Sequence, residues 1–269
     1  MSPIYVPGKV VLAKTYVGID DPDAAAYITQ VEAADEAASP GIGPLETATK
    51  VAIHSFVKGC KNDGIWPAIK ASCILAGART LTGALVPLVG PYPTNVGGLF
   101  VAGDYNRKTG LIGNGSTKYL DSNRANNADL QDSKHAAAYV SAAASNASYF
   151  FGDSAVSGCT LAARISASQL IFRVNTATNG NTNPGGEATG LVGVSRAESS
   201  TFIARANGTN SNLLINSITP TSTTIQIFSS GSLPTNARIA FYSIGGFLAL
   251  AQLDTRVTAL ITAIGAAIP

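Results

Sequence analysis

The chain has 269 residues, of which 46% are hydrophobic and 13% are charged, and its formal net charge is +2. This length fits one large domain with a sizeable core. The charged share is half of the usual ~25%, and the longest basic cluster is Arg107-Lys108. This composition argues against a nucleic-acid-binding protein. No apolar stretch is long enough to span a bilayer, so we expect no membrane partner.

The three cysteines, Cys60, Cys73 and Cys159, cannot all pair within one chain and are too widely spaced for a disulfide framework. We therefore expect buried free thiols. The first residues contain a proline and lack the apolar run of a signal peptide. This favours assembly in a reducing cytoplasm.

Residues 1–19 indicate an extended arm, because Pro3 and Pro7 forbid a helix. The arm is rich in β-branched and aromatic side chains and has no evident place in a core. We expect it to bind a neighbouring chain by strand addition. An edge strand of the chain's own sheet is the alternative. The residues expected to contact the partner are Ile4, Tyr5, Val6, Val10, Val11 and Leu12.

Residues 20–64 predict a helical hairpin. Asp21-Pro22-Asp23 supplies a capping carboxylate, a first-turn proline and a second acid favoured by the helix dipole. The segment SPGIGP (39–44) ends this helix, and a second helix follows over about 45–61. Neither helix is stable alone, so their apolar faces must be covered by the rest of the chain.

Residues 65–246 predict an antiparallel β-sandwich or jelly roll. The segment IWPAIKASCILAGA at the start is apolar but contains Pro67, and the next segment has too many Pro and Gly for a helix. Short β-type runs then alternate with polar turns. These runs cover 134–141, 148–153, 159–166, 169–175, 189–196, 200–207, 223–230 and 237–246.

Residues 247–269 predict a C-terminal amphipathic helix, with Leu250, Leu253, Val257 and Leu260 on one face. The helix either packs back on the helical hairpin or zips against copies of itself. We name these four residues as the candidate contacts of an oligomer.

The chain lacks the common catalytic and cofactor-binding motifs, namely GxSxG, HExxH, the P-loop and GxGxxG after a strand. The two histidines, His54 and His135, have no Cys or carboxylate at a metal-ligand spacing. We therefore predict no catalytic residue, no metal and no cofactor.

The acidic residues give no sign of a glycosidase, because there is no glutamate between Glu46 and Glu187 and the aspartates of the β region lie in loops. Asp129 and Asp132, with 126–127, could ligate Ca²⁺. A solvated turn is the reading we favour for this segment.

Three stretches carry a specific resemblance: DPDAAAYITQVEAAD with VKGCKNDGIWPAIKASCILAGARTLTGALVPLVG, then GDYNRKTGLIGNGSTKYLDSNRANNAD, and finally RIAFYSIGGFLALAQLDTRVTALITAI. They resemble a module of phage virion proteins, including those of cyanophages and other marine phages. The similarity covers about residues 20–268. It implies a concanavalin A-like, laminin-G-like sandwich flanked by helices. Gly245-Gly246-Phe247 departs from the Gly-Glu-Ser expected there, which bears on the helix start.

The resemblance and the missing catalytic residues together predict a non-enzymatic virion structural protein, either a capsid decoration or a tail or short-fibre component. A long fibre is not expected, because the chain has no repeats or heptads. We expect the arm to dock on other virion proteins. Low charge and apolar helical faces at 45–57 and 250–264 favour a homo-oligomer, with a trimer preferred.

The alternative function is a carbohydrate-binding adhesin or receptor-binding tail protein that recognises host surface polysaccharide. Sugar sites commonly use an exposed aromatic ring, and the only tryptophan, Trp66, precedes the sandwich next to Pro67. Tyr105, Tyr119 and Tyr149 are therefore the candidate glycan contacts.

Overall fold

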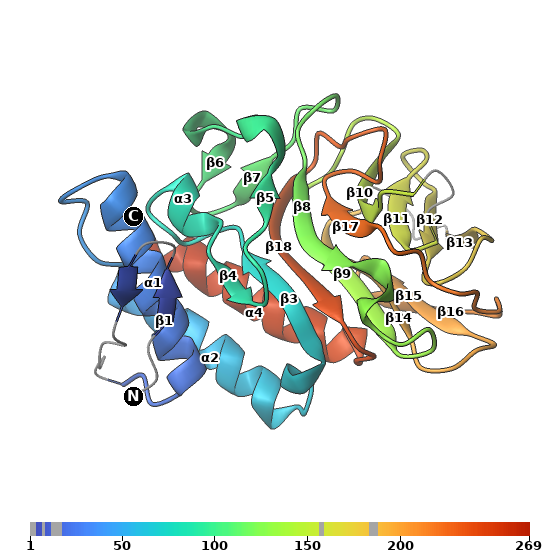
Figure 1. Cartoon of the computed structure of the whole chain (residues 1–269), viewed down its shortest axis with the longest axis horizontal. Helices are drawn as coiled ribbons and strands as arrows, with labels where there is room; N and C mark the ends of the chain where they lie inside the picture. Colours follow the sequence, from blue (N-terminus) through green and yellow to red (C-terminus); the bar gives the residue numbers. More distant parts are fainter. Residues whose placement is uncertain (1–3, 7–8, 12–17, 156–158, 183–187) are drawn as a thin grey trace.

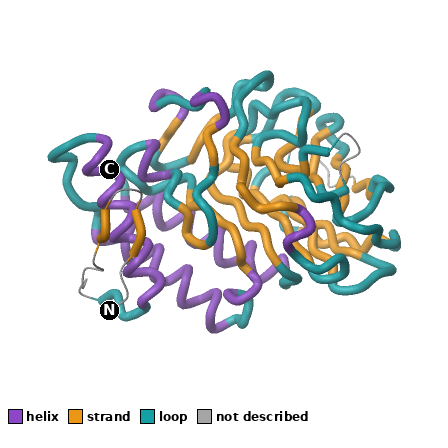
Figure 2. Tube along the Cα trace, in the orientation of Figure 1, coloured by secondary structure: helices purple, strands orange, loops and turns teal. Residues whose placement is uncertain are grey.

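The chain folds into two antiparallel β-sheets stacked face to face, with helices on the outer side of one sheet (Figure 1). The computed structural model describes residues 4–6, 9–11, 18–155, 159–182 and 188–269, the first two ranges by their backbone alone. Figure 2 shows the long helices gathered at one side of the molecule and the strands filling the other.

One sheet has seven strands within the described residues, in the order β13-β12-β11-β10-β17-β8-β5. All neighbouring pairs in it are antiparallel. Its strands are β13 (Gly180–Thr182), β12 (Leu170–Arg173), β11 (Leu161–Arg164), β10 (Ser148–Asp153), β17 (Thr224–Ile227), β8 (Leu120–Ala125) and β5 (Thr94–Asn95).

The other sheet has nine strands in the described part of the chain, seven of them in the order β16-β15-β14-β9-β18-β3-β4. Strand β7 pairs with β18, and β6 pairs with β7. Its strands are β16 (Thr209–Leu213), β15 (Phe202–Ala206), β14 (Gly190–Arg196), β9 (Lys134–Ala142), β18 (Arg238–Gly245), β3 (Ile69–Ile74), β4 (Pro87–Val89), β7 (Gly110–Ile112) and β6 (Tyr105–Asn106).

Two apolar layers hold these parts together. The first fills the space between the sheets and includes Phe150 and Phe172, both fully buried. The second lies between the nine-stranded sheet and the helices. Strand β18 contributes to both, because successive side chains of a strand point to opposite faces. Tyr242 belongs to the first layer, and Phe241 faces the second, where its ring centre lies 5.5 Å from that of Phe56.

The helical layer is built mainly from α1 (Pro22–Ala38), α2 (Thr47–Asn62) and α4 (Leu250–Ala267). The Asp21 carboxylate caps α1 as predicted, accepting from the backbone N–H of Asp23 (3.0 Å) and Ala24 (3.2 Å). Helix α4 packs along α2 and β14. The short elements are α3 (Leu81–Ala84), η1 (Trp66–Ala68), η2 (Val96–Gly98), η3 (Ala102–Asp104) and η4 (Asn126–Ala128).

The predicted β-type runs each contain an observed strand, which confirms the sandwich. Strand β3, which lies between β18 and β4 in the nine-stranded sheet, is one that the sequence does not predict. Pro67 weakens the signal there, but it lies in η1, just before the strand begins, and interrupts no ladder. Helix α3 is also unpredicted, and its single turn is capped by the Thr80 hydroxyl.

The arm forms a separate two-stranded sheet, β1 (Ile4–Val6) and β2 (Lys9–Val11), whose strands pair with each other and with neither sheet of the sandwich. The side chains of Ile4, Tyr5, Val6, Val10 and Val11, and the whole of Leu12, lie outside the described residues. The expected contact with a neighbouring chain therefore stays a prediction. Ile19 is 8% exposed and belongs to the helical core, so the arm ends before it.

Cys60, Cys73 and Cys159 are free and buried, which confirms the expectation for the thiols. Burial raises the pKa of the Cys60 thiol to about 12. None of the described helices combines the length and the apolar character that crossing a bilayer requires.

Candidate functional site

A cleft of about 280 Å³ opens where α1, η1 and β4 meet. Its lining combines a large aromatic side chain with polar and small apolar ones. The residues are Asp23, Ala26, Tyr27, Gln30, Trp66, Leu88 and Val89. Three segments far apart in the sequence therefore build one surface.

The polar side of the cleft comes from α1. Asp23 and Gln30 lie two helical turns apart, which places both on the same face of the helix. The Tyr92 hydroxyl donates to Gln30 Oε1 at 3.3 Å. The loop that carries Tyr92 is held in turn by Asn123, whose Nδ2 donates to the Tyr92 carbonyl at 2.7 Å.

Lys61 fixes the aromatic side of the cleft. Its Nζ lies 5.7 Å from the centre of the Trp66 ring, a cation–π distance. The same ammonium contacts the carboxylates of Asp21 at 2.7 Å and Asp23 at 2.8 Å. Burial works to lower the pKa of Lys61, but the two carboxylates outweigh it and raise that pKa. The amine is therefore a cation at neutral pH that pairs with Asp23 and lies beside the Trp66 ring.

Several polar atoms of the cleft are unused. Within the described part of the chain, Asp23 Oδ1, Gln30 Nε2 and Trp66 Nε1 make no hydrogen bond. The cleft thus offers one anionic acceptor, an amide donor and an indole donor beside apolar side chains. Directional polar groups around an apolar concavity are the usual composition of a small-molecule site.

The three tyrosines predicted as glycan contacts do not line this cleft, and the structure does not bring them together. The Tyr105 hydroxyl donates to the Ala78 carbonyl at 2.8 Å, and burial raises its pKa. Tyr119 packs on the core between the sheets, and Tyr149 packs on a small apolar cluster of the seven-stranded sheet. Trp66 precedes the sandwich in the sequence, which gives no sign of a binding role, yet folding places it beside α1 and β4.

The residues named for an oligomer contact lie inside the chain's own core. Leu253 and Val257 have no exposed surface, and Leu250 and Leu260 are 2% exposed. They face α2 and the nine-stranded sheet. These side chains are therefore not available on the surface of the folded chain, and the oligomeric state itself stays a prediction.

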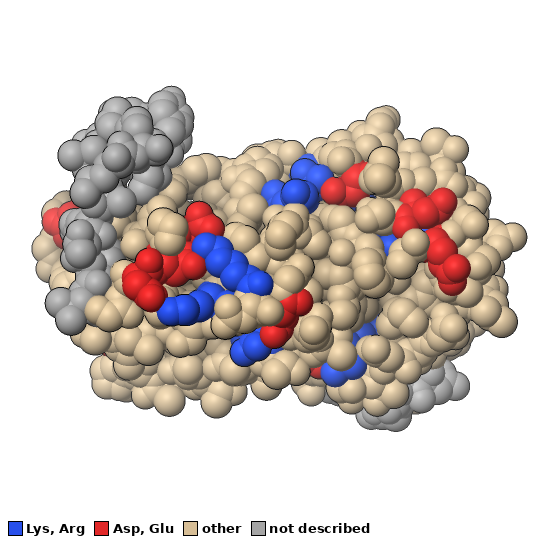
Figure 3. Space-filling view, turned by 90° about the horizontal axis from the view of Figure 1, so that it is seen from below, with Lys and Arg blue, Asp and Glu red and all other residues tan. Residues whose placement is uncertain are grey.

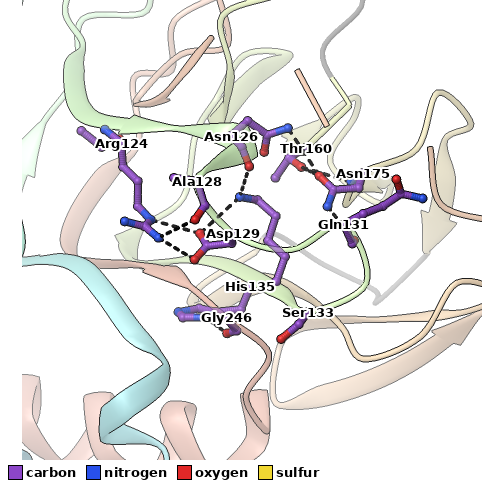
Figure 4. Close-up of polar contacts among 12 residues, drawn as sticks. Arg124, Asn126, Ala128, Asp129, Gln131, Ser133, His135, Thr160, Asn175 and Gly246 are labelled. Carbon is purple, nitrogen blue, oxygen red and sulfur yellow. Dashed lines mark hydrogen bonds and ion pairs between the residues drawn. The ribbon is translucent and has the colours of Figure 1, made fainter. Parts of the chain in front are cut away.

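A buried polar cluster at one end of the sandwich corrects the expectation of a solvated turn at Asp129 (Figure 4). Arg124 donates twice to Asp129, over 3.0 and 2.5 Å. Lys134, with no exposed surface, donates to the Asn126 carbonyl at 2.7 Å and lies 3.6 Å from Asp129. Burial lowers the pKa of Lys134 to about 8. Arg124 and Lys134 both lie against the Asp129 carboxylate, and the described residues contain no cluster of three His, Cys, Asp or Glu suited to a metal.

Both histidines have structural partners. His135 is fully buried, with Nδ1 2.6 Å from the Gly246 carbonyl and Nε2 2.8 Å from the Ser243 hydroxyl. Burial lowers its pKa to about 4, so at neutral pH Nδ1 donates to Gly246 and Nε2 accepts from Ser243. His54 Nε2 lies 2.6 Å from Asp20.

Charged side chains are sparse on the face shown in Figure 3. They form small groups, most with both signs present, and uncharged surface separates them. This matches the 13% share of charged residues in the sequence.

No protein-family model matches the chain, and no curated protein does. Among solved structures, the botulinum neurotoxin serotype D binding domain is similar, with a TM-score of 0.50 and 10% identity over 71% of this chain and 51% of that one. A mutant of Trypanosoma rangeli sialidase displaying trans-sialidase activity has a TM-score of 0.47 and 12% identity, over 78% of this chain and 39% of that one. Domain 4 of the Geobacillus stearothermophilus arabinanase AbnA has a TM-score of 0.32 and 12% identity, over 54% of this chain and 74% of that one.

The chain spans about half or less of the first two of these structures. At such identities the likeness shows the fold alone. The two stacked antiparallel sheets, the helices before them and the helix after them identify the chain as a concanavalin A-like β-sandwich with N-terminal helices and a C-terminal helix.

Proposed function

We propose that this protein is a non-catalytic carbohydrate-binding module, and that the cleft at Trp66 is its glycan site. The observation that carries the proposal is that Asp23, Gln30 and Trp66 line one cleft and that three of their polar atoms make no hydrogen bond among the described residues: Asp23 Oδ1, Gln30 Nε2 and Trp66 Nε1. The site would recognise a glycan of a host cell surface.

The chemistry of the cleft suits a sugar. A pyranose has an apolar C–H face that packs on an aromatic ring, and hydroxyl groups that need directional partners. The indole of Trp66 supplies a large apolar surface with a polar edge. Asp23 and Gln30 supply an acceptor and a donor on one helix face. A volume of about 280 Å³ is just below the ~300–1,000 Å³ usual for ligand pockets, which suits a ligand as small as one sugar ring.

The fold is compatible with a binding function but does not specify one. The structure with a TM-score of 0.50 is named a binding domain, and sandwiches of this kind serve many functions through grafted sites. The proposal therefore depends on the cleft and not on the fold.

We propose binding without turnover because three carboxylates of the sandwich are engaged by other side chains. Asp104 pairs with Lys118 at 2.6 Å, Asp129 pairs with Arg124, and Asp121 accepts from the Thr224 hydroxyl at 2.6 Å. A glycosidase needs two carboxyl groups facing each other across the sugar, roughly 5–9 Å apart. Paired and separated carboxylates support a binding site.

A second proposal concerns where the module acts. The resemblance of residues 20–268 to phage virion modules favours a structural place in a virion, in the capsid or the tail. The separate β1–β2 sheet supports an arm that joins the chain to another virion protein, since it is no part of the sandwich. We propose that the module is displayed there as a homo-oligomer, with a trimer preferred.

A glycan array probed with the full-length chain tests the carbohydrate proposal. We expect binding to a subset of glycans, and a loss of at least about tenfold in affinity for Trp66→Ala. Phe247→Ala is the matched control, because Phe247 is an exposed aromatic (45%) outside the cleft. The proposal fails if no glycan is retained, or if Trp66→Ala binds as the unaltered chain does while keeping its thermal midpoint.

A further inference from the structure

We propose that the cleft selects a neutral sugar that carries an acetamido group, an N-acetylhexosamine. This inference rests on the proposed glycan-binding function and names the class of ligand for the same site. It follows from matching the unused atoms of the cleft to the groups of a ligand.

The polar atoms match an acetamide. Asp23 Oδ1 is an acceptor, and an acetamide N–H is a donor that it can receive. Gln30 Nε2 and Trp66 Nε1 are donors, and the acetamide carbonyl accepts. The Tyr92 hydroxyl donates to Gln30 Oε1 at 3.3 Å, so this bond engages the acceptor end of the amide and leaves the Nε2 donors for a ligand.

The apolar part of the cleft matches a methyl group. Ala26, Leu88 and Val89 line the cleft beside the polar atoms, and each is partly exposed there. A ligand hydroxyl placed against these apolar side chains would lose its hydrogen bonds to water without gaining a protein partner, which costs free energy. A ligand methyl group in the same place would be removed from water, which lowers the free energy of binding. An unsubstituted hexose carries a hydroxyl where the acetamido group would be, so it brings no methyl group to these apolar side chains.

The charge of the cleft disfavours acidic sugars. Asp23 is a half-exposed carboxylate, and its cation, Lys61, is already held between Asp21 and Asp23. An incoming carboxylate would meet Asp23 without a free cation to neutralise it. Neutral acetamido sugars are therefore favoured over sialic acids.

Calorimetric titration of the full-length chain tests this inference. The probes are the methyl glycosides of N-acetylglucosamine and N-acetylgalactosamine, the methyl glycosides of glucose and galactose, and N-acetylneuraminic acid. We expect at least one acetamido sugar to bind at least about tenfold more tightly than its parent hexose and than the acidic sugar. Equal or tighter binding of the parent hexose or of the acidic sugar overturns the inference and leaves the glycan-binding function standing.

Variants separate recognition from folding. Asp23→Asn keeps the shape of the side chain and removes the anionic acceptor, so we expect the preference for the acetamido sugar to fall at least about tenfold. Asp20→Asn is the matched control, because Asp20 is a nearby carboxylate that pairs with Lys58 and lies outside the cleft. An unchanged preference in Asp23→Asn overturns the inference. If neither these probes nor the array give binding, the proposed function falls as well.

Discussion

At the scale of single residues, burial decides the chemistry of the polar groups. Lys134, His135 and Arg196 have no exposed surface, although all three can carry charge. Arg196 donates to five backbone carbonyls, those of Val174, Glu198, Ser199, Thr201 and Ile215. Such groups persist in a core because each has partners that replace water. Through these bonds Arg196 ties residues 198–201 to Ile215.

His135 predicts an acid-sensitive stability. Its pKa is about 4 in the folded chain, below the ordinary ~6.5 of the unfolded one. Between these values the unfolded chain binds a proton that the folded chain does not, so the free energy of unfolding falls as the pH drops through this window. This residue accounts for a loss of about 3 kcal/mol.

Urea unfolding at pH 7 and pH 4 measures that loss. The variant His135→Gln is expected to be less stable at pH 7 and to lose about 3 kcal/mol less on acidification. His54→Gln, which keeps His135, should retain the full acid sensitivity. If His135→Gln and the unaltered chain show the same pH dependence, the argument is wrong.

At the scale of elements, close packing requires glycine at two positions in strands of the nine-stranded sheet. Gly245 ends β18 where η1 leads into β3, and a Cβ at this position would lie 1.9 Å from the Ala68 carbonyl oxygen. Gly193 in β14 lies under α4, and a Cβ there would come 2.8 Å from the Ala137 Cβ. Glycine is required at such positions because even a methyl group would force the elements apart.

The variant Gly245→Ala is expected to lower the free energy of unfolding by about 2 kcal/mol or more, because the atom it meets is backbone. Gly265→Ala is the matched control. It lies in α4, where a Cβ would have no atom within 4 Å, so we expect a gain of about 0.5–1 kcal/mol from helix propensity. Thermal melts followed by circular dichroism measure both, and a neutral Gly245→Ala would contradict the packing argument.

At the scale of the whole molecule, the residues that follow the arm, Ile19 to Asp21, are held in place by the helical layer. Ile19 is buried in the helical core, and the Asp20 carboxylate lies 2.6 Å from His54 Nε2 and 2.9 Å from Lys58 Nζ. Asp21 pairs with Lys61. Hydrogen bonds with Lys58 and His54 lower the pKa of Asp20 to about 2, so this carboxylate is charged at all physiological pH values. The arm therefore starts from a fixed position.

Deleting residues 1–17 tests the role of the arm. Since β1 and β2 pair with neither sheet of the sandwich, we expect the shortened chain to keep its β signal and its thermal midpoint. On the proposed virion location, we also expect the shortened chain to be absent from assembled virions. The measurement is its occupancy in virions assembled beside the full-length chain. Incorporation at full occupancy would show that the arm is not the anchor. A deletion reaching residue 19 would confuse the result, because it removes Ile19 from the core.

The sequence by itself determined the local elements and the class of fold. The Asp21 cap sets the start of α1, and alternation along 170–174 sets which side chains of β12 face the core, because both signals depend only on neighbours in the chain. The expectation of free, buried thiols also follows from the sequence, because three widely spaced cysteines cannot form a disulfide framework. Strand β3 escaped prediction because Pro67, one turn before it, carried the stronger local signal.

Only the tertiary structure decided the candidate site. Asp23 and Gln30, Trp66, and Leu88 come from three separate segments, and no local pattern states that α1, η1 and β4 meet. The same holds for the face of α4 that carries Leu253. Its periodicity shows that the face is apolar, but whether it packs inside the chain or against a copy depends on the position of α2 and β14. Contacts between distant segments follow from the packing of whole elements, which the sequence encodes only collectively.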